Sequence, residues 1–136
     1  MYIQRPLSFW EASGMAKVLV IEDDDHIWKL IEYKLKKEKH DLIWANDGLK
    51  ALEILKETKP DLIISDIMVP YMDGIQILKE IKANDELKDI PVIMLTSKAQ
   101  EADIVKGLEL GAQDYMAKPF SPAELILRVN KVLKSN

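Results

Sequence analysis

Short runs of apolar residues alternate along the chain with segments in which apolar residues recur every three or four positions. Each run has the length and composition of a β-strand, and they cover residues 17–21, 41–45, 61–65, 91–95 and 114–117. The first, third and fourth runs are almost entirely apolar, as is typical of parallel strands covered on both faces. The segments between the runs have the spacing of amphipathic helices.

Turn and capping residues fall at the limits of these predicted helices. Asp-Gly pairs at 47–48 and 73–74 precede the second and third helices. Ser121 with Pro122 and Glu124 forms the start of the last helix as a capping box. Five strand–helix units in one chain predict an α/β fold, a doubly wound parallel sheet with helices on both sides.

Polar side chains follow four of the predicted strands at the edge where ligands bind in such sheets. They are Glu22, Asp23 and Asp24 after the first strand, Asp66 after the third, Thr96 and Ser97 after the fourth, and Lys118 and Pro119 after the fifth. Clustered carboxylates raise one another's pKa values, and Mg²⁺ relieves this repulsion because it prefers a few oxygen ligands and waters.

A metal-loaded cluster of this kind suits phosphoryl transfer. One carboxylate can attack an electrophilic phosphorus and form an acyl phosphate, while Mg²⁺ and a lysine neutralise the transition state. Asp66, at the end of the central strand, is the candidate nucleophile. Each motif alone has an ordinary explanation as a turn, a cap or a loop, but their joint appearance at successive strand ends favours the functional interpretation.

Composition narrows the classes further. The chain of 136 residues is long enough for one domain with a core, and its net charge of −4 argues against direct binding of a nucleic acid. It has no cysteine, hence no disulfide or thiolate site. No apolar run approaches the length of a membrane span, and we expect a cytoplasmic protein.

Residues 1–14 do not share the periodic pattern, which begins after Met15. We expect them to be a poorly ordered extension or an artificial remnant. The alternative is a docking segment anchored by Leu7, Phe9 and Trp10. Residues 15–136 would then form the functional domain.

Four stretches resemble the response regulator receiver domain of two-component signalling, from about Lys17 to Lys134. They are "VLVIEDDD", "PDLIISDIMVPYMDG", "PVIMLTSKA" and "GAQDYMAKPFSPAEL". The resemblance implies the CheY-like, flavodoxin-like (βα)5 fold with strand order 2-1-3-4-5.

The resemblance also implies roles for individual residues. Asp66 would be the phosphoacceptor, and Mg²⁺ would be held by Glu22, Asp23, Asp66 and the backbone carbonyl of Met68. Thr96 and Lys118 would bind the phosphoryl group.

Three more positions resemble features of the family that shape or time the response. The peptide before Pro119 would be cis. Tyr115 would be the aromatic switch, or else an ordinary strand residue. Met68 and Lys98 occupy positions where the family varies its dephosphorylation rate, and both side chains could obstruct the hydrolytic water.

The implied partners are a sensor histidine kinase or phosphotransfer domain as the phosphoryl donor, and an output domain or partner protein. The output would meet the surface formed by the fourth helix, fifth strand and fifth helix, and a homodimer could form there on phosphorylation. The positions that carry paired charges in DNA-binding relatives correspond here to Ile104, Leu110 and Gln113, although Lys106, Glu124 and Arg128 remain. That departure leaves the dimer geometry open.

Three alternatives compete with a phosphorylation-switched receiver that catalyses only its own phosphorylation and dephosphorylation. A phosphate-independent scaffold of the same fold is disfavoured because every required residue type is present. An aspartyl-phosphate phosphatase needs a second Asp where this chain has Met68, and a flavodoxin needs a phosphate loop where it has acidic residues. His26 and His40, at the ends of the first helix, are expected at the surface.

Overall fold

The computed structural model describes residues 15–97 and 101–135 as alternating strands and helices. The strands are β1 (Lys17–Ile21), β2 (Asp41–Ala45), β3 (Leu62–Asp66), β4 (Val92–Thr96) and β5 (Asp114–Ala117). The helices are α2 (Asp25–Lys37), α3 (Gly48–Glu57), α4 (Gly74–Ala83), α5 (Glu101–Glu109) and α6 (Pro122–Ser135). Strands β3 and β4 begin and end one residue later than predicted. Residues 1–14 and Lys98 lie outside the described residues.

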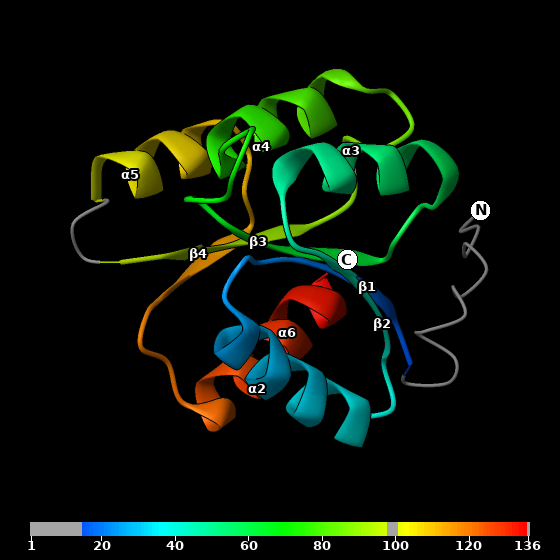
Figure 1. Ribbon diagram of the computed structural model, residues 1–136, viewed down its shortest axis with the longest axis vertical. Coiled ribbons are helices and arrows are strands. Elements are labelled where there is room, and N and C mark those ends of the chain that lie inside the picture. Colours follow the sequence, from blue (N-terminus) through cyan, green and yellow to red (C-terminus); the bar gives the residue numbers. More distant parts are fainter. Residues whose placement is uncertain (1–14, 98–100, 136) are drawn as a thin grey trace, which may run out of the picture.

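The five strands form one parallel sheet in the order β2-β1-β3-β4-β5, which confirms the predicted topology. Helices α3, α4 and α5 cover one face and α2 and α6 cover the other (Figure 1). The order reverses direction at β1, so the connections after β1 and β3 leave the sheet on opposite sides. Such a switch point opens a crevice at the carboxyl ends of the strands.

Side chains on the central strands alternate between two hydrophobic cores. Leu19 and Ile21 of β1 point into the core under α3 to α5, whereas Val18 and Val20 point into the core under α2 and α6. All residues of β3 and β4 are buried, while most of β2 and β5 at the sheet edges is half-buried. The continuous apolar runs in the sequence therefore follow from coverage of both faces.

Aspartate and serine side chains start the helices by accepting hydrogen bonds from the first backbone N–H groups. Asp47 accepts from Lys50 N, Asp73 accepts from Gln76 N, and Ser121 Oγ accepts from Glu124 N. The predicted starts of α3, α4 and α6 are thus confirmed. No helix among the described residues has the length and apolar character that crossing a membrane requires.

The expectation for His40 was wrong, whereas His26 is exposed as expected. His40 is only 7% exposed, and its Nδ1 accepts a hydrogen bond of 2.9 Å from Ala16 N. Lys39, with a φ of 66°, turns the chain back toward β1. Burial lowers the pKa of His40 below its ordinary 6.5, although the charge of Glu38 opposes this effect, so the neutral ring serves as an acceptor.

Candidate functional site

Three carboxylates meet at the carboxyl ends of the adjacent strands β1 and β3. Oxygen atoms of Glu22, Asp23 and Asp66 all lie within 4.8 Å of one another. The pairing of Ile21 with Ser65 places these strand ends side by side. Glu22 is fully buried and Asp66 is 6% exposed, whereas Asp23 faces solvent. The cluster therefore has a buried floor and an open side.

One ammonium group reaches this cluster from the far side of β4. Lys118 follows β5, and its Nζ lies 2.7 Å from Glu22 Oε1 and 2.5 Å from Asp66 Oδ2. Its backbone N–H donates to Thr96 O at 2.6 Å, which ties the lysine to the end of β4. The Lys118–Pro119 peptide is cis.

Burial and charge shift the titration of the two partners in the same direction. Burial raises the pKa of Glu22 from 4.5 to about 7, although the neighbouring ammonium of Lys118 opposes that shift. Burial alone would lower the pKa of Lys118, but the hydrogen bond to Asp66 and the ion pair with Glu22 outweigh it and hold this pKa above its ordinary value. Within residues 15–97 and 101–135, the ammonium of Lys118 is the positive group that pairs with this cluster of three carboxyl groups.

The donor set fits a hard divalent cation. Among the described residues this cluster offers only carboxylate oxygens, the ligand type that Mg²⁺ prefers. Glu22 Oε1 is buried and forms an ion pair with Lys118. Among the described residues, however, no donor is aligned to give this oxygen a hydrogen bond. A buried oxygen in this condition is costly, and a cation bound beside it would remove that cost.

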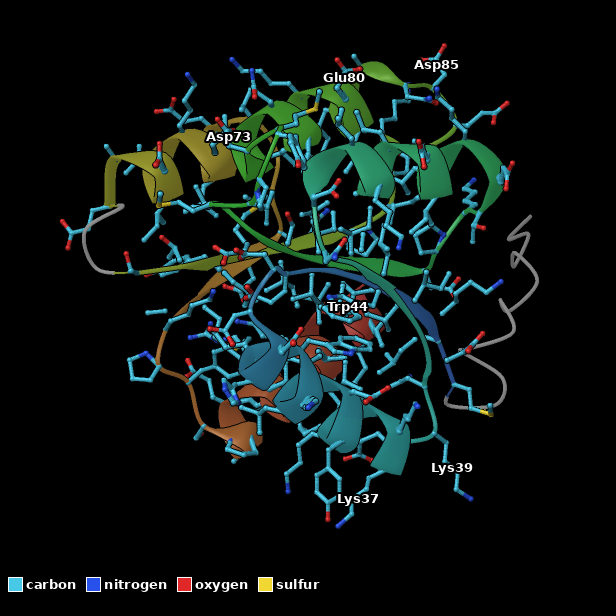
Figure 2. The ribbon with its side chains drawn as sticks, viewed as in Figure 1. Lys37, Lys39, Trp44, Asp73, Glu80 and Asp85 are labelled. Atoms are coloured by element: carbon cyan, nitrogen blue, oxygen red, sulfur yellow. The ribbon has the colours of Figure 1, made fainter. Side chains whose placement is uncertain are left out.

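The segment after Asp66 closes another side of the site. The backbone N–H of Met68 donates to Asp66 Oδ1 at 3.1 Å, while the Met68 side chain is 68% exposed. Beyond it, a groove of about 700 Å³ runs along the start of α4 toward Lys79 and Lys106. Figure 2 labels Asp73 at the start of α4 in this region.

Of two residues that the resemblance associates with switching, one is the last residue of β4 and the other is the second residue of β5. Thr96 is fully buried, and its Oγ1 donates to Ser97 O at 3.1 Å. Tyr115 is 38% exposed and lines, with Ile104 and Ala117, a cavity of about 350 Å³ beside the end of β4. Its ring therefore lies at the surface, next to space that it could enter.

Sequence reasoning did not identify Trp44 as a neighbour of the site. Its Nε1 donates to Glu22 O at 2.7 Å, and its ring stacks on Trp28 with centroids 5.0 Å apart. Figure 2 shows Trp44 between the sheet and α2. A tryptophan on an edge strand gives no signal of such a contact, because the partner is a backbone carbonyl 22 residues away.

Comparisons with known proteins agree on one family. The response regulator receiver domain family matches residues 18–130. The chain is 45% identical over 118 residues to the alkaline phosphatase synthesis transcriptional regulatory protein PhoP of Bacillus subtilis, covering 87% of this chain and 48% of that protein. The chain thus spans about half the length of this curated relative.

Solved structures of response regulators and receiver domains have the same fold over most of this chain. The receiver domain of Francisella response regulator 1452 is 38% identical with a TM-score of 0.80, and the match covers 88% of this chain and 98% of that one. The chemotaxis response regulator CheY4 of Vibrio cholerae is 30% identical with a TM-score of 0.82, and the match covers 87% of this chain and 98% of that one.

A third structure, the receiver domain of a sensor histidine kinase from Pseudomonas aeruginosa, has a magnesium ion coordinated in its active site cleft. It is 29% identical to this chain with a TM-score of 0.80, at 88% and 98% coverage. Sequence, strand order and the structures agree, and this chain belongs to the response regulator receiver domain family.

Proposed function

We propose that this domain is a phosphoacceptor that takes a phosphoryl group from a phosphohistidine of a sensor histidine kinase or phosphotransfer domain onto Asp66. The observation that carries the proposal is the setting of the Asp66 carboxylate. It is buried, it accepts hydrogen bonds from Lys118 Nζ and Met68 N, and it lies within a carboxylate cluster at the functional edge of the sheet. An oxygen of Asp66 attacks phosphorus, the bond from phosphorus to the donor nitrogen breaks, and the released imidazole takes up a proton.

Mg²⁺ would be held by Glu22, Asp23, Asp66 and the backbone carbonyl of Met68. When bound, it would supply positive charge to the phosphoryl oxygens as negative charge shifts among them. Lys118 acts on the same oxygens from the side of β5, because its ammonium already lies 2.5 Å from Asp66. The magnesium in the Pseudomonas receiver domain supports this assignment.

The phosphoryl donor protein would approach beside Lys118. An apolar pocket of about 290 Å³ is lined by Ile27, Leu30, Lys118, Pro119 and Phe120. It joins α2 to the segment after β5, immediately next to the acidic cluster. An exposed apolar pocket of this kind suits a helical partner better than a small solute.

The output would be carried by the α5-β5-α6 surface, the fourth helix, fifth strand and fifth helix of the fold. Once phosphorylated, Asp66 would draw the Thr96 hydroxyl and Lys118 toward the phosphoryl oxygens, and Tyr115 would enter the cavity beside β4. Phosphorylation would thereby shift the population between two conformations of this surface. This requires only that the phosphoryl group stabilise one conformation more than the other.

Without phosphate, this surface exposes apolar side chains, and its arginine forms ion pairs within the chain. Val105 is 57% exposed and Leu127 is 66% exposed. Arg128 forms ion pairs within the chain, with Asp114 at 3.1 Å and Glu124 at 3.5 Å. The binding partner of the α5-β5-α6 surface would be an output domain, another protein or a second copy of this domain. The name of the Bacillus relative, a transcriptional regulatory protein, supports an output domain in a longer chain.

A phosphate-independent scaffold of the same fold is the alternative, and mass spectrometry separates the two. The intact protein is incubated with acetyl phosphate, with and without Mg²⁺. The same is done with Asp66→Asn and with a control, Asp61→Asn, at the opposite end of β3. A single Mg²⁺-dependent addition that only Asp66→Asn lacks is expected. No addition to the parent protein would contradict the proposal.

A further inference from the structure

The loop of residues 67–73, which follows Asp66, is held in a strained conformation at its tip. Pro70 O accepts a hydrogen bond from Met72 N at 2.9 Å, and Tyr71 between them has a φ of 71° and is 81% exposed. A three-residue turn with positive φ at its centre is rare and strained. Such a conformation persists only where neighbouring structure imposes it.

The neighbour that contacts this tip is Gly48, the first residue of α3. Gly48 N donates to Pro70 O at 3.1 Å, so one carbonyl accepts from both sides. A Cβ on Gly48 would lie 2.2 Å from Met72 O and 2.9 Å from Met72 Cβ. The first contact is with rigid backbone, so any larger residue at position 48 must push the loop or the helix aside.

The loop in turn orients the candidate nucleophile. Met68 N donates to Asp66 Oδ1 at 3.1 Å, while Oδ2 accepts from Lys118. The two hydrogen bonds together fix the plane of the carboxylate. At its base the loop is closed by Gly74 N, which donates to Ile67 O at 2.7 Å. The loop is short and closed by this hydrogen bond, so a displacement of Pro70 and Met72 also displaces the backbone of Met68.

We infer that Gly48 is a positioning residue for Asp66, acting from α3 through the tip of the loop 67–73 and the amide of Met68. The inference rests on the proposed function for its consequence in phosphoryl transfer, but the contacts themselves are independent of it. The Asp47-Gly48 pair thus does more than start α3. It supplies the only kind of residue that lets the helix start and the loop backbone touch.

Gly48→Ala tests this role against a matched glycine. Gly107→Ala in α5 is the control, because a Cβ there would meet its nearest atoms, side-chain carbons of Ile75 and Met94, at an ordinary 3.7 Å. Two quantities are measured below the melting temperature of each variant. One is the rate of phosphorylation by acetyl phosphate with Mg²⁺, and the other is the backbone amide resonance of Met68 without phosphate donor.

Gly48→Ala is expected to lower the phosphorylation rate by about tenfold or more, since small misplacements of reacting groups have effects of this size. It is also expected to shift the Met68 amide, while Gly107→Ala changes neither. Equal rates and an unmoved Met68 amide in Gly48→Ala would overturn the inference. If the parent protein itself takes no phosphoryl group, the proposed function fails, and the Met68 resonance alone decides the positioning role.

A second measurement covers the case in which Gly48→Ala does not fold. In the parent protein, Mg²⁺ is titrated while the amide resonances of Gly48, Met68 and Gly107 are followed. Coupling through the loop predicts that Gly48 shifts together with Met68 and that Gly107 does not. Movement of Met68 without Gly48 would overturn the inference.

Discussion

Replacing Lys118 by Met removes the ammonium that pairs with Glu22 and Asp66 and keeps most of the side-chain volume. The Lys118 side chain is 21% exposed, and its partners Glu22 and Asp66 are 0% and 8% exposed as side chains. Without Mg²⁺, the variant leaves two buried carboxylates, next to Asp23, without the positive charge that pairs with them in the parent protein. Part of the response can be protonation of Glu22, whose pKa is already raised to about 7.

The expected cost is large for a single substitution. Removing one partner of a buried ion pair destabilises a protein by about 3–5 kcal/mol. The exposed Asp23 side of the cluster admits water, so we expect the lower end, about 3 kcal/mol. For a domain of this size that corresponds to a fall in Tm of about 12 °C. Saturating Mg²⁺ restores positive charge and should narrow the difference between variant and parent.

Thermal and urea unfolding in EDTA at pH 8 measure this cost, with Lys88→Met as the matched control. Lys88 pairs with Asp85 at 3.6 Å, but the two side chains are 50% and 95% exposed, so its loss should cost no more than about 1 kcal/mol. If Lys118→Met is no less stable than Lys88→Met under these conditions, the electrostatic reasoning about the cluster is wrong.

Three further predictions concern other parts of the structure. Since burial lowers the pKa of His40 below 6.5, its contribution to stability is present above that pH and is lost as the pH falls through the folded-state pKa. His40→Asn, which keeps an acceptor for Ala16 N, should flatten the dependence of Tm on pH below 6.5; an unchanged slope contradicts the assignment. Trp44 donates to Glu22 O, so Mg²⁺ should change the tryptophan emission of the parent protein and not that of Trp44→Phe, and an equal change in both would refute the coupling. Met68→Asn replaces an apolar side chain beside Asp66 with a polar one that can admit water, so loss of phosphate from the phosphorylated protein should be faster, and an unaltered half-life would show that Met68 does not obstruct the water.

Periodicity and turn residues were sufficient to predict the sheet because both faces of this fold are covered. The apolar runs of β1, β3 and β4 could only be buried strands, and their parallel arrangement placed Glu22, Asp66 and Thr96 at one edge. The resemblance added the strand order, and the sheet confirms it. The convergence of Lys118 on the carboxylates follows from the same topology.

Contacts between backbone atoms distant in sequence gave no such signal. His40 was expected at the surface because it falls at the end of the first helix, yet the turn at Lys39 directs it to Ala16. The sequence indicated Gly48 only as part of the turn before the second helix, and its contact with Met72 depends on how α3 packs against a loop more than twenty residues later. In both cases the deciding partner is a main-chain atom, which has the same chemistry in every residue and leaves no trace in the sequence pattern.

Because the strands are parallel, the functional groups lie at one edge of the sheet, and the opposite edge is the better site for attaching the domain to a surface or a label. At the amino end of β1, Lys17 N donates to Asp61 Oδ2, and no group of the acidic cluster is near. The carboxyl end lies about 16 Å away along a five-residue strand. A dye, a bead or a sensor chip coupled near Lys17 would leave the Asp66 edge facing the solution (Figure 1). Kinetic measurements on the tethered domain should therefore report the same chemistry as measurements on the free one.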